Sequence, residues 1–179
     1  GRIHSICVGA HFAFGHGRDG NLELLQQLGQ DMKFIVHGLS NLSLDGETVS
    51  STRIRAAITE GQLDAAGQML GREYALAGEV VKGDQRGREL GFPTANLDIT
   101  DLCTPPNGVY AAHAEVNGAS HRAAVNIGLR PTVAEAEPTL HVEAHLLDFE
   151  GDLYGKELSL TFVDKLRDEK PFDSLDALK

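Results

Sequence analysis

The sequence has no tryptophan, only two cysteines, and few positive charges: 16 Lys and Arg stand against 26 Asp and Glu, a formal net charge of -10. Because nucleic-acid surfaces depend on clustered Lys and Arg, this balance argues against a general nucleic-acid-binding protein. Cys7 and Cys103 are too few for a disulfide framework and have no partner cysteines at metal-ligand spacing. No run of about 18 apolar residues is present, and the first residues do not resemble a signal peptide. We therefore expect a cytoplasmic protein that does not contact a membrane.

The pattern of the residues changes near residue 73. Before it, an apolar run at 6–8 predicts a strand, and Leu22, Leu25 and Leu28 repeat at helical spacing up to Gly29. Residues 32–39 predict a further strand. Residues 51–70 predict two short helices that follow a Ser-Ser pair and end at Gly71. This first part, residues 1–72, is therefore expected to be α/β.

After this point the sequence has the pattern of a β domain. Strand-length runs at 75–83, 108–118, 121–129, 139–149 and 156–166 are separated by Gly, Pro, Asn or Asp. Such spacing is typical of an antiparallel sandwich or barrel. Only residues 171–179 resemble a helix, so we expect a mainly β domain over residues 73–179 with a helix at its end.

The stretch 83–99, GDQRGRELGFPTANLDI, combines backbone freedom with positive charge. Glycines let consecutive backbone N–H groups approach an anion, and nearby cations balance its charge. The stretch lacks the lysine that ends a G-x-x-x-x-G-K-[ST] phosphate loop, so a phosphate site here is of another kind; the alternative is a solvated turn. Its glycines are Gly83, Gly87 and Gly91, and the cations in and before it are Lys82, Arg86 and Arg88.

A second pattern lies in the run 139–149. If it is a strand, His141, Glu143 and His145 share one face, and the apolar residues between them share the other. Such a row could hold a metal ion, as in a metal-dependent hydrolase that uses the two histidines. It could instead present Glu143 as a general base. The third interpretation is an ordinary exposed face of an antiparallel sheet.

Taken together, GDQRGRELGFPTANLDI, GVYAAHAEVNG, AAVNIGLRPTV and the segment from VEAHLLDF to the last residue resemble, in this order, the riboflavin kinase module of bacterial bifunctional riboflavin kinase/FAD synthetases. The similarity covers about residues 74–179, and its most specific element is the tetrapeptide PTAN. It implies a six-stranded antiparallel Greek-key barrel with a C-terminal helix.

The resemblance also implies roles for single residues. Thr94 and Asn96 would hold Mg²⁺ together with the phosphate oxygens of ATP, and Glu143 would accept the proton of the ribityl 5′-hydroxyl. Without the resemblance, Thr94 and Asn96 beside a proline would indicate only a turn. The remaining implied contacts are Arg86, Arg88 and the loop glycines with phosphate, Phe92 with flavin or adenine, and Asp173 and Leu175 with the isoalloxazine.

The first part of the chain resembles the other module of that family, the FMN adenylyltransferase. VGAHFAFGHGRDG is similar to the family's G-x-D-F-x-F-G segment, although His11 and Ala13 replace its usual Asp and Arg. VSSTRIR is similar to its ISSTxIR element, which implies triphosphate contacts; the same residues also make a good helix cap. The family's H-x-G-H motif is not in this sequence, so residues 1–72 are expected to be part of a Rossmann-like nucleotidylyltransferase domain. The residues implied are Ser51, Thr52 and Arg55.

The expected activity is that of a riboflavin kinase, which converts riboflavin and ATP to FMN and ADP with Mg²⁺. Two alternatives stay open. The protein could also adenylylate FMN to FAD, or it could bind flavin or nucleotide without catalysis. The oligomeric state leaves no mark in the sequence.

Overall fold

The computed structural model describes residues 3–83, 92–130 and 139–170. Two compact units are present, residues 1–50 and residues 51–179, and each is described by itself. The second unit contains both helices of 51–70 as well as the barrel. The expected domain boundary between residues 72 and 73 stays a prediction.

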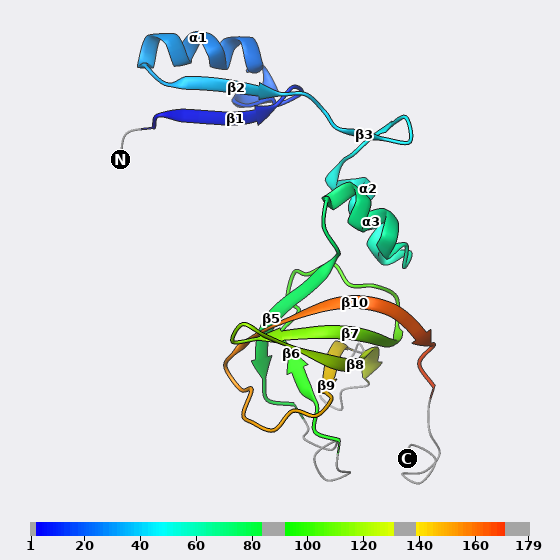
Figure 1. Ribbon diagram of the computed structural model, residues 1–179. Coiled ribbons are helices and arrows are strands. Elements are labelled where there is room, and N and C mark those ends of the chain that lie inside the picture. The colour runs from blue at the N-terminus through cyan, green and yellow to red at the C-terminus, as the bar shows by residue number, and fades with distance from the viewer. Residues whose placement is uncertain (1–2, 84–91, 131–138, 171–179) are drawn as a thin grey trace. The chain divides into compact units, whose positions relative to one another are not determined.

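The first unit is built on a parallel strand pair with a connecting helix (Figure 1). Strand β1 (Ser5–Gly9) pairs with β2 (Ile35–Leu39), and η1 (His16–Arg18) and α1 (Leu22–Met32) connect them. The hairpin of β3 (Ser43–Leu44) and β4 (Glu47–Thr48) follows. Both predicted strands are confirmed, whereas membership of a Rossmann-like sheet stays a prediction.

Helix α1 corrects one expectation. It does not end at Gly29 but continues to Met32, and Lys33 takes the left-handed conformation that ends it. A Cβ at position 29 would lie 2.7 Å from the Phe34 carbonyl oxygen and 3.0 Å from a Val36 methyl. This glycine is therefore explained by the close packing of α1 against β2, and not by a helix end.

The second unit begins with α2 (Ser51–Thr59) and α3 (Leu63–Leu70), which confirm the two predicted helices. Gly71 ends α3 in the left-handed conformation, with its N–H donating to the Gly67 carbonyl.

Cys103 contacts α2, because its thiol donates a hydrogen bond to the backbone carbonyl of Arg55 at 3.7 Å. The Cys103 carbonyl in turn accepts a hydrogen bond from the Tyr74 hydroxyl. Burial raises the pKa of Tyr74 to about 12.

Six strands close into a barrel in the order β10-β5-β6-β9-β8-β7, and every neighbouring pair is antiparallel. Consecutive hairpins join β7, β8 and β9, and β6 returns beside β9, which is a Greek key. The expected barrel is thus confirmed; the expected C-terminal helix, residues 171–179, lies outside the described residues. The strands are β5 (Ala75–Val81), β6 (Ala95–Leu97), β7 (Gly108–Val116), β8 (Ala119–Arg130), β9 (Thr139–Leu146) and β10 (Glu157–Arg167).

The core lies inside this barrel, where alternate residues of each strand point inward. Leu158 and Leu160 of β10 are fully buried, and Tyr110 of β7 is 1% exposed while its hydroxyl donates to the Pro106 carbonyl at 2.6 Å. The Tyr110 ring meets that of Phe162 edge-on, at a centroid distance of 5.3 Å. The interior is thus filled by side chains, which leaves the outward-facing residues of the same strands for chemistry.

Candidate functional site

Three polar side chains stand in one row across the barrel wall formed by β6, β9 and β8. Glu143 of β9 is paired with Asn96 of β6 on one side and with Asn126 of β8 on the other. Directly paired residues project from the same face of a sheet, with Cβ atoms about 4.5–5.5 Å apart. The adjacent pairs, Ala95 with Ala144 and Ala144 with Val125, belong to the core, so this row faces outward. We call Asn96, Glu143 and Asn126 the polar row.

Asn96 is held tightly although its side chain is polar. Asn96 is 8% exposed, and it is the only buried polar or charged residue in the part of the chain that the structure describes. Gly83 packs directly on its amide, since a Cβ at position 83 would lie 2.6 Å from the Asn96 Cγ. Any other residue at position 83 would displace the amide. Gly83 therefore leaves room for the Asn96 amide, a close approach that only glycine permits.

The segment before β6 is fastened to β9 through His145. The Nδ1 atom of His145 lies 2.9 Å from the Pro93 carbonyl oxygen, so the imidazole donates to this carbonyl. The half-exposed Phe92 ring meets the imidazole edge-on, with centroids 5.7 Å apart. This contact holds the backbone beside Thr94 against the strand that carries Glu143.

The positions of His141 and His145 do not support the hypothesis of a metal-dependent hydrolase. His145 is engaged with the backbone of Pro93. The Nε2 atom of His141 is buried and makes no hydrogen bond within the described part of the chain. In that same part, no group of three or more His, Cys, Asp or Glu side chains is arranged to hold a metal ion.

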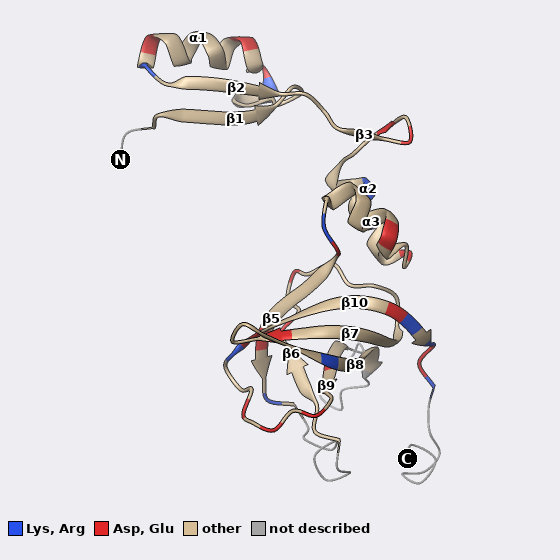
Figure 2. Cartoon of the chain, in the orientation of Figure 1, with Lys and Arg blue, Asp and Glu red and all other residues tan. Residues whose placement is uncertain are grey.

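A cleft of about 670 Å³ opens next to Thr94. One wall is the segment from Pro93 to Ala95, and the opposite wall is the loop between β9 and β10, which carries acidic side chains (Figure 2). Thr94 thus lines the cleft and lies two residues before Asn96 of the polar row. The lining residues are Val80, Pro93, Thr94, Ala95, Ala144, Leu146, Phe149, Glu150, Gly151, Asp152, Leu153 and Tyr154.

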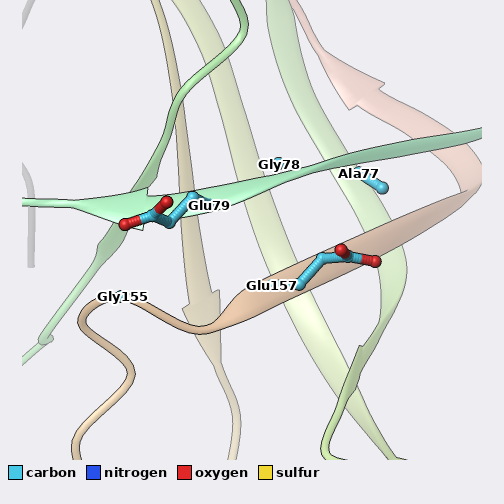
Figure 3. A pocket seen from close by; sticks show the side chains of 5 residues that line it. All are labelled: Ala77, Gly78, Glu79, Gly155 and Glu157. Carbon is cyan, nitrogen blue, oxygen red and sulfur yellow. The ribbon is translucent and has the colours of Figure 1, made fainter.

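A smaller depression of about 370 Å³ lies elsewhere on the barrel, between β5 and β10. Its carboxylates belong to Glu79 and Glu157, which are paired directly across the two strands. Both residues are exposed. Figure 3 shows the two carboxylates pointing away from one another. None of the predicted site residues lines this depression.

The other predicted residues lie apart from the polar row or beyond the described chain. Ser51, Thr52 and Arg55 are exposed residues of α2 and line neither of the two depressions. Lys82 is exposed just after β5. Outside the described residues lie Arg86, Gly87, Arg88, Gly91, Asp173 and Leu175.

The sequence analysis did not select Asn126. Alternation along 121–129 places it on the outward face, but nothing local distinguishes it from an ordinary exposed residue. Its position beside Glu143 depends on the register between β8 and β9. Strand register is a property of the folded sheet, and the pattern of one strand does not specify it.

Comparison with known proteins identifies the family of the chain. Residues 70–179, more than half of the chain, match the family model described as riboflavin kinase. The chain belongs to the riboflavin kinase family. The resemblance seen in the sequence is thereby confirmed, and residues 2–53 also match a model described as FAD synthetase.

Two curated relatives are bifunctional riboflavin kinase/FMN adenylyltransferases. The protein of Pseudomonas fluorescens is 43% identical over 177 residues, and that of Escherichia coli K12 is 40% identical over 181 residues. Each alignment covers 99% of this chain but only 57% and 56% of the respective relative, so the chain spans little more than half their length.

Among solved structures, a crystal structure described as a macrolide-efflux protein from Streptococcus pneumoniae is similar, with a TM-score of 0.72 and 33% sequence identity. The match covers 95% of this member of the riboflavin kinase family and 54% of the other chain. Within the described residues, no helix is both long and apolar enough to cross a membrane.

Proposed function

We propose that this protein is a riboflavin kinase, which transfers the γ-phosphoryl group of ATP to the 5′-hydroxyl of riboflavin and releases FMN and ADP. The observation that carries the proposal is the direct pairing of Asn96 with Glu143 across β6 and β9. It places a candidate base and a candidate metal ligand on the same outward face, as transfer between an alcohol and a metal-bound phosphate requires.

Glu143 is the proposed general base. Its carboxylate would accept the proton of the 5′-hydroxyl, which needs a separation of about 2.6–3.2 Å between the two oxygens. As the hydroxyl oxygen bonds to the γ-phosphorus, the bond from that phosphorus to the bridging oxygen of ADP breaks. The flanking Asn96 and Asn126 carry no charge, so they do not repel the approaching phosphate.

Thr94 and Asn96 are the proposed protein ligands of Mg²⁺. A hydroxyl and an amide carbonyl provide oxygen donors, which Mg²⁺ prefers, and one or two protein ligands suffice where phosphates and water complete the shell. The residues fit this group, because Gly83 leaves room for the Asn96 amide and the Pro93–His145 contact holds the segment that carries Thr94. The ion would supply neutralisation of the charge on the phosphate oxygens.

The cleft beside Thr94 is the proposed site of a flat ring. Its lining includes Phe149 and Tyr154 together with the carboxylates of Glu150 and Asp152. Carboxylates disfavour a triphosphate there, whereas aromatic and aliphatic walls suit adenine. The predicted phosphate contacts of Arg86 and Arg88, the contact of Phe92 with flavin or adenine, and the flavin contacts of Asp173 and Leu175 remain part of this proposal.

The other two candidate functions have less support. Adenylylation of FMN rests on the match of residues 2–53 to the FAD synthetase model. A purely binding role does not account for a carboxylate placed beside Asn96. A cytoplasmic location, where ATP is present and cysteines stay reduced, is consistent with the proposed kinase.

The test is to incubate the full chain with riboflavin, ATP and MgCl₂ and to separate the flavins by reversed-phase chromatography. We expect FMN in an amount equal to the ADP released, and no product when chelator replaces the metal. Riboflavin recovered unchanged, with binding still visible by calorimetry, would identify a binder. Formation of FAD from added FMN and ATP would identify the adenylyltransferase.

A further inference from the structure

The third member of the polar row, Asn126, has no part in the proposed proton and metal chemistry. It lies on the outward face of β8, between the inward-facing Val125 and Ile127, both of which are fully buried. Asparagine is depleted in strands, because it packs poorly on a pleated surface. A half-buried asparagine in the middle of a twelve-residue strand therefore calls for a specific role.

The neighbours of Asn126 leave this residue partly exposed. The outward neighbours along β8 are Ala124 and Gly128, which have little or no side chain. The Glu169 carboxylate occupies the place where a Cβ of Gly128 would lie. The space over Asn126 is thus bounded by Glu169 along the strand, by Glu143 on β9 and by Val109, its partner on β7.

The amide itself has unused hydrogen-bonding capacity. Within the described part of the chain, no side-chain hydrogen bond of Asn126 is present. A carboxamide offers two donor hydrogens and one acceptor oxygen, which match a hydroxyl group that both donates and accepts. Leaving such a group without a partner when a ligand covers it is unfavourable, so the ligand should provide one.

The order of the row gives the direction of the substrate. With the phosphate on the Asn96 side and the reacting hydroxyl at Glu143, the rest of the ribityl chain extends toward β8. Neighbouring strands lie about 4.8 Å apart, a distance that a short stretch of polyol covers. We propose that the Asn126 carboxamide hydrogen-bonds one of the two secondary hydroxyls nearest the reacting end, 4′ or 3′, and so selects a polyol side chain. This inference rests on the proposed function.

The experiment compares the wild-type chain with Asn126→Ala and with Ser120→Ala, a control on the same strand and the same outward face but remote from the polar row. Each protein is tested with riboflavin, 4′-deoxyriboflavin and 3′-deoxyriboflavin. The measured quantities are kcat/KM for phosphorylation and the flavin Kd from fluorescence quenching. Circular dichroism confirms that each variant is folded.

We expect the wild type to prefer riboflavin over one of the two deoxy analogues. Asn126→Ala should lower kcat/KM and binding for riboflavin about 3- to 10-fold, the effect of one neutral hydrogen bond, and leave that analogue unchanged. The preference should then vanish, while Ser120→Ala retains it. An equal loss for all three flavins would overturn the inference and assign Asn126 to the orientation of Glu143; an unchanged preference would overturn it as well.

The same data separate this inference from the proposed function. If no flavin is phosphorylated but the Kd values show a preference that Asn126→Ala removes, the kinase proposal fails and the role of Asn126 stands. If FMN forms but the wild type distinguishes neither analogue in turnover or in binding, the kinase proposal stands and the role of Asn126 is wrong.

Discussion

Two of the barrel's outward-facing carboxylate positions have the same local structure, a strand, and differ in their partners. Glu143 on β9 lies between two asparagines, Asn96 and Asn126, whereas Glu79 on β5 is paired with a second carboxylate, Glu157 on β10. Like charges directly opposite one another destabilise a sheet, while neutral amides do not.

The difference shows what makes a strand carboxylate useful. Amide neighbours can supply a metal ligand and a hydroxyl contact on either side of a base, and they add no negative charge against an incoming phosphate. The Glu79–Glu157 pair provides neither. We therefore expect chemistry at the polar row and only a small stability cost at the second position.

Of all the substitutions, Glu143→Gln should have the largest effect on catalysis. Removal of a general base should lower kcat about 10²- to 10⁴-fold, with a much smaller change in the KM for ATP. The matched control is Glu157→Gln, which makes the same chemical change at the other position and should leave kcat unaltered. Steady-state FMN formation measures both, and equal turnover in Glu143→Gln would remove this residue from the mechanism.

Asn96→Ala should have the second largest effect on catalysis. Loss of one preorganised oxygen ligand is expected to lower kcat/KM about 100-fold and to raise the Mg²⁺ concentration needed for half-maximal rate. Asn96→Asp keeps an oxygen donor and should recover part of the activity. A magnesium titration of the three proteins is the measurement; if their midpoints coincide, Asn96 is not a metal ligand.

His145→Phe tests whether the segment before β6 must be fastened to β9. Phenylalanine retains a ring beside Phe92 but removes the hydrogen bond to the Pro93 carbonyl. The unpaired carbonyl should loosen this segment and raise the KM for Mg·ATP about 3- to 10-fold. His145→Asn, which retains a donor, serves as the control. A fall in kcat with no change in KM would point to a different role for His145.

Particular residues show how much of the fold could be predicted from the sequence. Alternation in 139–149 predicted correctly that Val142, Ala144 and Leu146 are buried while Glu143 faces outward. Strand β6 was not among the predicted strand-length runs, because its three residues are too few for a pattern. It is a strand because β5 and β9 pair with it on both sides.

The sequence also predicted part of the candidate site. The roles of Thr94, Asn96 and Glu143 came from a resemblance. The pairing of Asn96 with Glu143 follows from a β6–β9 register that neither segment alone reveals. Asn126 was missed for the same reason. Gly29 was misinterpreted as a helix end, because its role is to make room for the Phe34 carbonyl in a tertiary contact.

Tyr74→Phe provides a stability test outside both carboxylate positions. Burial raises the pKa of Tyr74 from 10.0 to about 12. Between these values the unfolded chain loses the phenolic proton more readily than the folded one, so the free energy of unfolding should fall as the pH rises from about 10 to 12. Urea titrations across this range should show a smaller fall for Tyr74→Phe. Parallel curves for the two proteins would contradict the assignment.

The smallest expected effect is on stability at the second carboxylate position. Glu157→Gln removes the repulsion from Glu79 and should raise the free energy of unfolding by about 0.2–1 kcal/mol at low ionic strength. Added salt should reduce the gain, because it screens exposed charges. Urea unfolding at two salt concentrations measures it. A loss of stability would mean that the pair is favourable, which would weaken the contrast with the polar row.

The central claim is tested most directly by a crystal structure of the chain with riboflavin, Mg²⁺ and a non-hydrolysable ATP analogue. The account predicts the terminal ribityl oxygen within about 2.6–3.2 Å of the Glu143 carboxylate and the metal ion bound to Thr94 and Asn96. A flavin whose terminal hydroxyl lies out of reach of Glu143, or a metal ion seated at Glu79 and Glu157, would contradict it.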